Sequence, residues 1–284
     1  MMVGVLSWEL LGRPAIRRRR EEQRSYPTRE ARFSSARTGR GSVSCYGNGK
    51  TRYRSKSLAH LAAVGHHTTM ARTNPDETFS AGEELAHSLT HGTGLLLGIA
   101  ALVLMVVFAA QKGSAIHVVS CAVFGVTLVV LYASSTLYHA LPAGRGKRVF
   151  GILDHAAIFL LIAGTYTPFA LVTLNGRWGW SLFAVIWGLA VGGIVLEAVS
   201  RGRVRRIQLL LYLAMGWGIV GAARPLLREL AAGGLALLLA GGLAYTLGVV
   251  FFVWKRPFHH ALWHVFVLGG SICHFFAVLL YVIP

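Results

Sequence analysis

Long apolar segments follow one another from about residue 88 to the end of the chain, and only short polar stretches separate them. Each segment is close to the roughly 20 residues that an α-helix needs to cross a bilayer. No connecting stretch is long enough to hold a second core, so the pattern predicts one all-α membrane domain, a bundle of seven transmembrane helices. The predicted spans are about 88–110, 115–141, 149–173, 178–198, 206–227, 233–254 and 260–283.

Basic residues between the spans predict the orientation of the bundle. Lys and Arg gather after the second, fourth and sixth spans, at 145–148, 201–206 and 255–256, whereas the alternate stretches carry few. Loops rich in Lys and Arg stay in the cytoplasm. With an odd number of spans, we therefore expect a cytoplasmic N-terminus and a C-terminus outside.

The N-terminal part differs from the rest in composition. Residues 1–70 hold 14 Lys and Arg against four Glu and have no sustained helical periodicity, which is typical of disorder. We therefore divide the chain into a basic extension at 1–79 and a membrane domain at 80–284. The extension is interpreted as a basic arm for anionic lipid, as a targeting segment, or as an artefact of the start site that ends at Met70. We favour the last or a dispensable tail, and we expect no nucleic-acid partner.

The composition is that of a membrane protein, and the cysteines indicate no cysteine-based cofactor site. Hydrophobic residues make up 54% of the chain and charged residues only 14%, well below the charged share of a soluble domain. The three cysteines are scattered, so they indicate neither a disulfide framework nor a cysteine-based metal site.

Ionisable and hydroxyl side chains mark the ends of three predicted spans. Ser135 and His139 are four residues apart at the end of the second span, so they share one helix face, and His260 and His264 form a similar pair at the start of the seventh. Asp154 lies near the start of the third span. The predicted orientation brings all five to the cytoplasmic leaflet. Such residues are costly inside a bilayer and are therefore candidates for function.

Three imidazoles with one open position are a coordination pattern of catalytic zinc. His139, His260 and His264 are therefore the candidate ligands, although imidazole also suits other divalent ions. Asp154 is the candidate general base that holds or deprotonates a water, and Ser135 is the candidate that orients the water or donates to a developing oxyanion.

A third polar stripe, Glu84, His87, Thr90 and His91, opens the first predicted helix at helical spacing, and its role is left open. For His87, His91 and His259 we favour an amphipathic histidine with a wet tip at the interface over a metal ligand.

Four further residues receive structural interpretations. Glu197 is expected to face headgroups or the basic loop beside it, and Pro168 to kink the third helix. His274 lies about 15 Å deeper than His264 and is expected to be packed or hydrogen-bonded. Tyr166 is expected to pack or to form a hydrogen bond across the bundle.

The same stretches carry a family resemblance. EELAHSLTHGTG at 83–94, SSTLYHAL at 134–141, DHAAIFLLIAGTYTPFAL at 154–171 and HALWHVFVLGGSICHF at 260–275 are together similar to the hemolysin III family, the bacterial branch of the progestin and adipoQ receptor family. The resemblance covers about residues 80–284. One departure is His87, where relatives often have Asn.

The resemblance implies seven helices in the bacterial plasma membrane with zinc on three histidines, which match His139, His260 and His264. In the same way, the family's serine corresponds to Ser135 and its aspartate to Asp154. A wider superfamily that resembles this family includes the alkaline ceramidases, which are zinc-dependent amide hydrolases.

Three functions follow as alternatives, all with membrane lipids as partners. The first is a zinc-dependent hydrolase of lipid amides or esters, or a regulator of membrane lipid state. The second is a ligand-responsive, receptor-like protein in which zinc is structural. A pore or cytolysin ranks third, because the polar groups gather at one end instead of running along whole helices.

Overall fold

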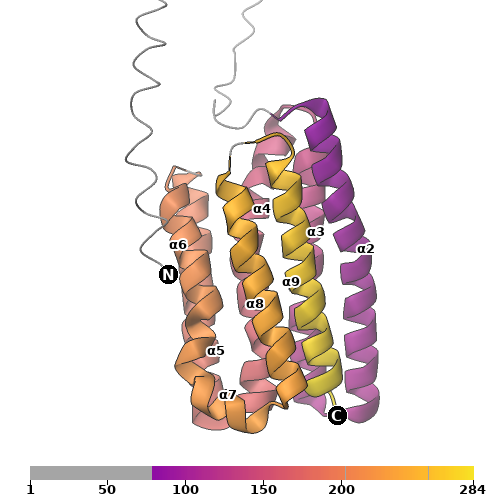
Figure 1. Ribbon diagram of the computed structural model, residues 1–284, viewed down its shortest axis with the longest axis vertical. Helices are drawn as coiled ribbons and strands as arrows, with labels where there is room; N and C mark the ends of the chain where they lie inside the picture. The colour runs from indigo at the N-terminus through magenta and orange to yellow at the C-terminus, as the bar shows by residue number, and fades with distance from the viewer. Residues whose placement is uncertain (1–78, 202, 255) are drawn as a thin grey trace, which may run out of the picture. The chain divides into compact units, whose positions relative to one another are not determined.

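A computed structural model describes residues 79–201, 203–254 and 256–284 (Figure 1). The predicted extension at 1–79 lies almost entirely outside the described residues. Within the described part, all regular structure is helical. The elements are α2 (Ala81–Lys112), α3 (Ala115–Ala140), α4 (Arg145–Pro168), the π-helix η1 (Phe169–Leu174), α5 (Gly176–Ser200), α6 (Arg205–Trp217), the 3-10 helix η2 (Gly218–Ala222), α7 (Ala223–Glu229), α8 (Ala232–Val253) and α9 (His259–Tyr281).

Seven of the described helical segments are long and apolar enough to cross a membrane, which confirms the predicted bundle. Two of these spans are composite, since α4 continues into η1, and α6, η2 and α7 follow one another as the fifth span. Many side chains on the outside are apolar and exposed, including Leu96 and Val199. Lipid is the solvent that such a surface requires. The orientation with the N-terminus inside stays a prediction from loop charge.

The first helix begins earlier than its apolar run predicts, at Ala81 instead of near residue 88. Ser80 caps it: its side chain accepts a hydrogen bond from the Glu83 backbone N–H, and the Glu83 carboxylate accepts one from the Ser80 backbone N–H. This capping box satisfies N–H groups that a helix start leaves unpaired. The extra turns place Glu84 and His87 on a helix, where they can be aimed into the bundle.

Pro168 ends the regular α-helix of the third span, and the chain continues as the π-helix η1. Proline lacks the N–H that an α-helix needs and crowds the preceding turn, so a change of helix type at this residue has a direct cause. Tyr166 forms the expected cross-bundle hydrogen bond, because its hydroxyl donates to the Met215 carbonyl at 2.7 Å.

The bundle brings the ends of four helices together at the upper end of Figure 1, where α2 and α9 begin and the α3–α4 connection lies. The most extensive packing joins α2 to α3, α8 to α9 and α3 to α4. Gly241 allows α8 to approach α9 closely, since a Cβ there would lie 2.4 Å from the His274 ring. His274 itself is buried with Nε2 3.2 Å from the Leu238 carbonyl oxygen, which confirms its structural interpretation.

Candidate metal centre

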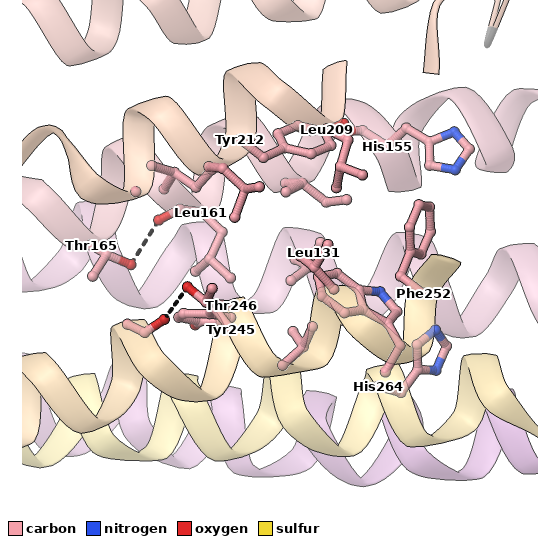
Figure 2. Close-up of a pocket in the computed structure, with 18 of the residues that line it drawn as sticks. Leu131, His155, Leu161, Thr165, Leu209, Tyr212, Tyr245, Thr246, Phe252 and His264 are labelled. Carbon is pink, nitrogen blue, oxygen red and sulfur yellow. Dashed lines mark hydrogen bonds between the residues drawn. The ribbon is translucent and has the colours of Figure 1, made fainter. Parts of the chain in front are cut away.

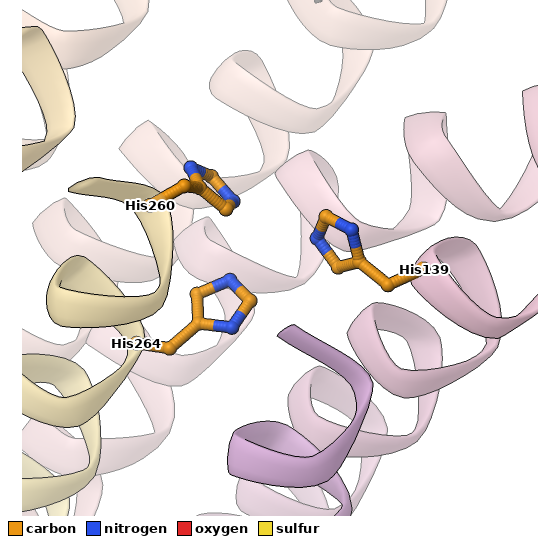
Figure 3. Close-up of side chains that lie close together, drawn as sticks. All are labelled: His139, His260 and His264. Atoms are coloured by element: carbon orange, nitrogen blue, oxygen red, sulfur yellow. The ribbon is translucent and has the colours of Figure 1, made fainter. Parts of the chain in front are cut away.

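Three of the sequence-predicted residues meet at this end of the bundle. His139 comes from the last turn of α3, and His260 and His264 come from the first two turns of α9. Figure 3 shows their rings directed toward one another. All three residues are buried, and each offers one ring nitrogen within 4.8 Å of those of the other two. This is a group of side chains that could hold a metal ion.

Glu84 on α2 fixes the orientation of the His139 ring. One oxygen of its carboxylate lies 2.7 Å from His139 Nδ1, and the other accepts a hydrogen bond from Lys147 Nζ, also at 2.7 Å. An ionised carboxylate only accepts hydrogen bonds, so Nδ1 carries the proton and Nε2 keeps its lone pair. That Nε2 is buried and has no hydrogen-bond partner among the described residues. A carboxylate that orients a ligand histidine in this way is a common feature of metal sites.

Thr90 plays a similar part for His264. Its hydroxyl lies 3.2 Å from His264 Nδ1 and already donates to a backbone carbonyl one turn back on α2. The hydroxyl therefore accepts from Nδ1–H, which leaves Nε2 of His264 as the free nitrogen. His91 stacks on the other side, with ring centroids 3.5 Å apart and planes inclined by 11°.

His87 and His91 are not the interfacial histidines that we expected. Their exposed fractions are 0% and 3%, and none of their four ring nitrogens has a hydrogen-bond partner in the described chain. The early start of α2 and its close packing on α3 carry both rings inside the bundle. His259 does lie at the edge, half-buried, with Nδ1 3.0 Å from the Phe251 carbonyl oxygen.

The centre is closed by residues that the sequence pattern did not single out. Phe79 packs on the rings of His87 and His260, at centroid distances of 4.6 and 5.2 Å. Glu83 accepts a hydrogen bond at 3.0 Å from the backbone N–H of Phe258, which holds the start of α9 against the start of α2. Phe258 has φ of 58°, a left-handed conformation that is uncommon for a bulky residue.

Asp154 and two of the candidate ligands, His260 and His264, line one cavity of about 130 Å³. Most of the other lining side chains are apolar. Figure 2 shows His155, Phe252 and His264 at one end of this cavity and Thr165 toward the other. His264 and His274 both line it, so it extends about 15 Å along α9.

Ser135 lies one turn before His139 on the same face of α3, as predicted. It is fully buried, and its hydroxyl has no hydrogen-bond partner among the residues described. The roles of Asp154 and Ser135 stay predictions.

The unpartnered ligand atoms at this end of the bundle are of a kind that binds metal ions. Buried polar groups are nearly always hydrogen-bonded, yet here His87, His91, Ser135 and His139 all have unpartnered buried atoms within the described structure. The free atoms are mainly imidazole nitrogens, which are ligands for divalent transition metals. A cation bound at His139, His260 and His264 would satisfy nitrogens that the protein itself leaves unpaired.

A second buried polar group lies nearby, around Glu197, and it corrects one of the two surroundings predicted for this residue. This residue is 1% exposed and does not face headgroups. Its carboxylate forms an ion pair with His155 Nδ1 at 3.5 Å and accepts a hydrogen bond from the Gln208 side-chain amide. We call Glu197, His155 and Gln208 the glutamate cluster. Packing of α5 against α4 and α6 turns the carboxylate inward, where these partners offset the cost of burial.

Comparison with known proteins agrees with the fold. The family model described as "Haemolysin-III related" matches residues 79–275. The chain is 49% identical to Hemolysin-3 of Bacillus cereus, over 71% of this chain and 93% of that protein. It is 48% identical to a Hemolysin-3 homolog of Bacillus subtilis strain 168, over 72% of this chain and 96% of that protein.

A more distant relative extends the likeness to animals. The human monocyte to macrophage differentiation factor is 29% identical over 55% of this chain and 67% of its own length. Together with the seven apolar helices, these relatives identify a multi-pass membrane protein, located in bacteria in the plasma membrane. The chain belongs to the haemolysin III family, within the wider progestin and adipoQ receptor family.

Proposed function

We propose that this protein is a zinc-dependent intramembrane hydrolase of lipid amide or ester bonds. One observation carries the proposal: Asp154, His260 and His264 line the same elongated, mainly apolar cavity inside a membrane bundle. A catalytic zinc site commonly has three protein ligands of this type. When bound, zinc would act as a Lewis acid toward the scissile carbonyl.

The residues of the chain divide the remaining work. The apolar wall of the cavity binds an acyl chain and excludes water from it, which leaves the scissile bond at the polar end. Asp154, buried on that wall, takes the proton of the attacking water and later returns it to the leaving amine or alcohol. Ser135 donates a hydrogen bond from its hydroxyl to the oxyanion that develops on the carbonyl. Glu84 and Thr90 hold two of the imidazoles in their working tautomers.

The test is hydrolysis by purified protein in liposomes. The full chain, loaded with about one zinc ion, is incubated with N-acyl and O-acyl lipids, and released fatty acid is measured by mass spectrometry. We expect release that falls about 100-fold or more in Asp154→Asn while the zinc content is unchanged, because a general base contributes about 10²–10⁴-fold. No release from the zinc-loaded parent, or equal release from Asp154→Asn, would refute the hydrolase.

A second candidate is a ligand-responsive membrane protein in which zinc is structural. It is favoured by the fourth buried imidazole, His87, because structural zinc sites are usually closed by four protein ligands.

A further inference from the structure

The His87 ring lies among the three candidate ligands. Its centroid is 4.6 Å from that of His139, 4.9 Å from that of His260 and 5.4 Å from that of His264. The three candidate ligands are themselves separated by 5.3, 5.2 and 4.6 Å. Four points with six nearly equal separations can only be the corners of a tetrahedron. We call these four residues the histidine cluster.

This spacing matches a particular kind of coordination. Four imidazoles bound tetrahedrally, with Zn–N bonds of about 2.0 Å, have ring centroids about 5 Å apart. The six observed separations lie on either side of that value. The geometry points to His87 as a fourth metal ligand, which makes this a closed four-imidazole centre. The inference rests on the metal of the proposed function, although not on hydrolysis.

Burial supports the same assignment. His87 is fully buried, and neither ring nitrogen has a hydrogen-bond partner in the part of the chain that the structure describes. The nearest carboxylate, Glu84, is 4.0 Å from His87 Nδ1 and is already committed to His139 and Lys147. A cation at the centre of the tetrahedron would give one of these nitrogens a partner.

A separate cation held by Glu84, His87 and His139 is the competing arrangement, since ligand atoms of these three also lie within 4.8 Å of one another. It is disfavoured because Lys147 Nζ is 2.7 Å from the Glu84 carboxylate, so a second cation would have to displace or repel an ammonium group. It would also need Nδ1 of His139, which the hydrogen bond to Glu84 already uses.

A closed centre has a consequence for the hydrolase. Water or substrate can enter only when one imidazole leaves. His139 and His264 are held by Glu84 and Thr90, whereas neither His87 nor His260 has such a hydrogen bond to any described residue. Of the two, only His260 lines the cavity, so we assign release to His87, which keeps the centre closed until substrate arrives.

The test counts imidazoles on the metal in the full chain. The parent, His87→Asn and His91→Asn are purified with zinc or loaded with Co²⁺. Zinc-edge X-ray absorption then gives the number of imidazole ligands, and the Co²⁺ visible spectrum reports the geometry. His91→Asn is the matched control, because it removes a buried histidine one turn along α2 that lies outside the tetrahedron.

We expect about one ion and four imidazoles in the parent and in His91→Asn. His87→Asn should retain the ion with three imidazoles and one oxygen ligand. Its zinc affinity should fall about 100-fold or more, because removing a ligand lowers metal affinity more than removing a residue that only orients a ligand, which costs about 10–100-fold.

Three imidazoles in the parent, or two ions per chain, would overturn the inference, and the parent count does not depend on how the variants fold. A folded parent without metal would overturn both proposals. Four imidazoles without lipid hydrolysis would leave this inference intact and refute only the hydrolase.

Discussion

The histidine cluster and the glutamate cluster are both buried polar groups inside the same bundle, but they differ in whether the protein satisfies them. In the glutamate cluster, both carboxylate oxygens of Glu197 have a partner, on His155 and on Gln208. In the histidine cluster, both nitrogens of His87 and Nε2 of His139 have none among the described residues.

That difference separates a structural role from a binding role. A buried polar group that is fully paired adds rigidity and needs nothing further. A buried group without a partner carries a cost that persists unless something else pairs with it. The glutamate cluster therefore joins helices, whereas the histidine cluster has nitrogens with which it could hold a metal ion.

The largest expected effect is loss of the metal from His260→Ala combined with His264→Ala. Removing two of the ligands should reduce the zinc content from about one per chain to none, since the remaining donors cannot complete a tetrahedral site. The zinc content is measured by mass spectrometry on protein purified without chelator.

His117→Ala is the control for that experiment. This imidazole lies at the opposite end of α3, next to its cap Ser114, and should leave the zinc content unchanged. Zinc retained in the double variant would mean that the histidine cluster is not the metal site.

Glu197→Ala tests the opposite side of the comparison. It should destabilise the fold by about 3 kcal/mol, because it leaves the buried Gln208 side chain and the partly buried His155 ring without their acceptor. It should not change the zinc content. Thermal unfolding in detergent and metal analysis of the same sample measure both.

Glu229→Ala is the matched control for charge removal. Glu229 is exposed at the end of α7, so its loss should change stability by no more than about 0.5 kcal/mol. A Glu197→Ala variant that lost zinc but kept its stability would reverse the roles assigned to the two clusters.

The sequence predicts the fold well because the bilayer imposes a length and an apolar composition on every span. All seven spans are found in the described structure, and the start of the first differs because α2 extends by a capped polar segment. Ser80 and Glu83 form the sequence pattern of a capping box, which predicts a helix start at this point, but a search for apolar runs does not detect that pattern.

The site is predicted only in part, because helix faces can be read from spacing but helix rotation cannot. The i, i+4 pair on α9 and the placement of His139 bring the three candidate ligands together as expected. Whether Glu197 or His87 faces lipid or protein depends on which side of α5 or α2 packs inward, and single-helix spacing leaves that open. Helical spacing places Glu84 in a polar stripe, but its contact with His139 depends on the packing of α2 on α3.

Glu84→Gln should weaken the centre without destroying it. Its carboxylate holds the His139 ring, and loss of an outer partner of this kind typically costs about 10–100-fold in metal affinity. Competition with a chromogenic chelator measures the affinity. Glu83→Gln is the matched control, because Glu83 is adjacent but serves the helix cap and the Phe258 backbone. Equal affinities for the two variants would contradict the role given to Glu84.

The smallest effect is expected from Thr90→Val. The hydroxyl of Thr90 lies 3.2 Å from His264 Nδ1, but it is neutral and one hydrogen bond of this kind is worth about 1 kcal/mol, so zinc affinity should fall only about fivefold. Thr93→Val is the control, since the Thr93 hydroxyl donates to the Leu89 carbonyl and belongs to an exposed contact. The order matters more than either value: a carboxylate should orient its histidine more strongly than a hydroxyl does. If Thr90→Val weakened the zinc site as much as Glu84→Gln, the charge of Glu84 would not explain how His139 is held.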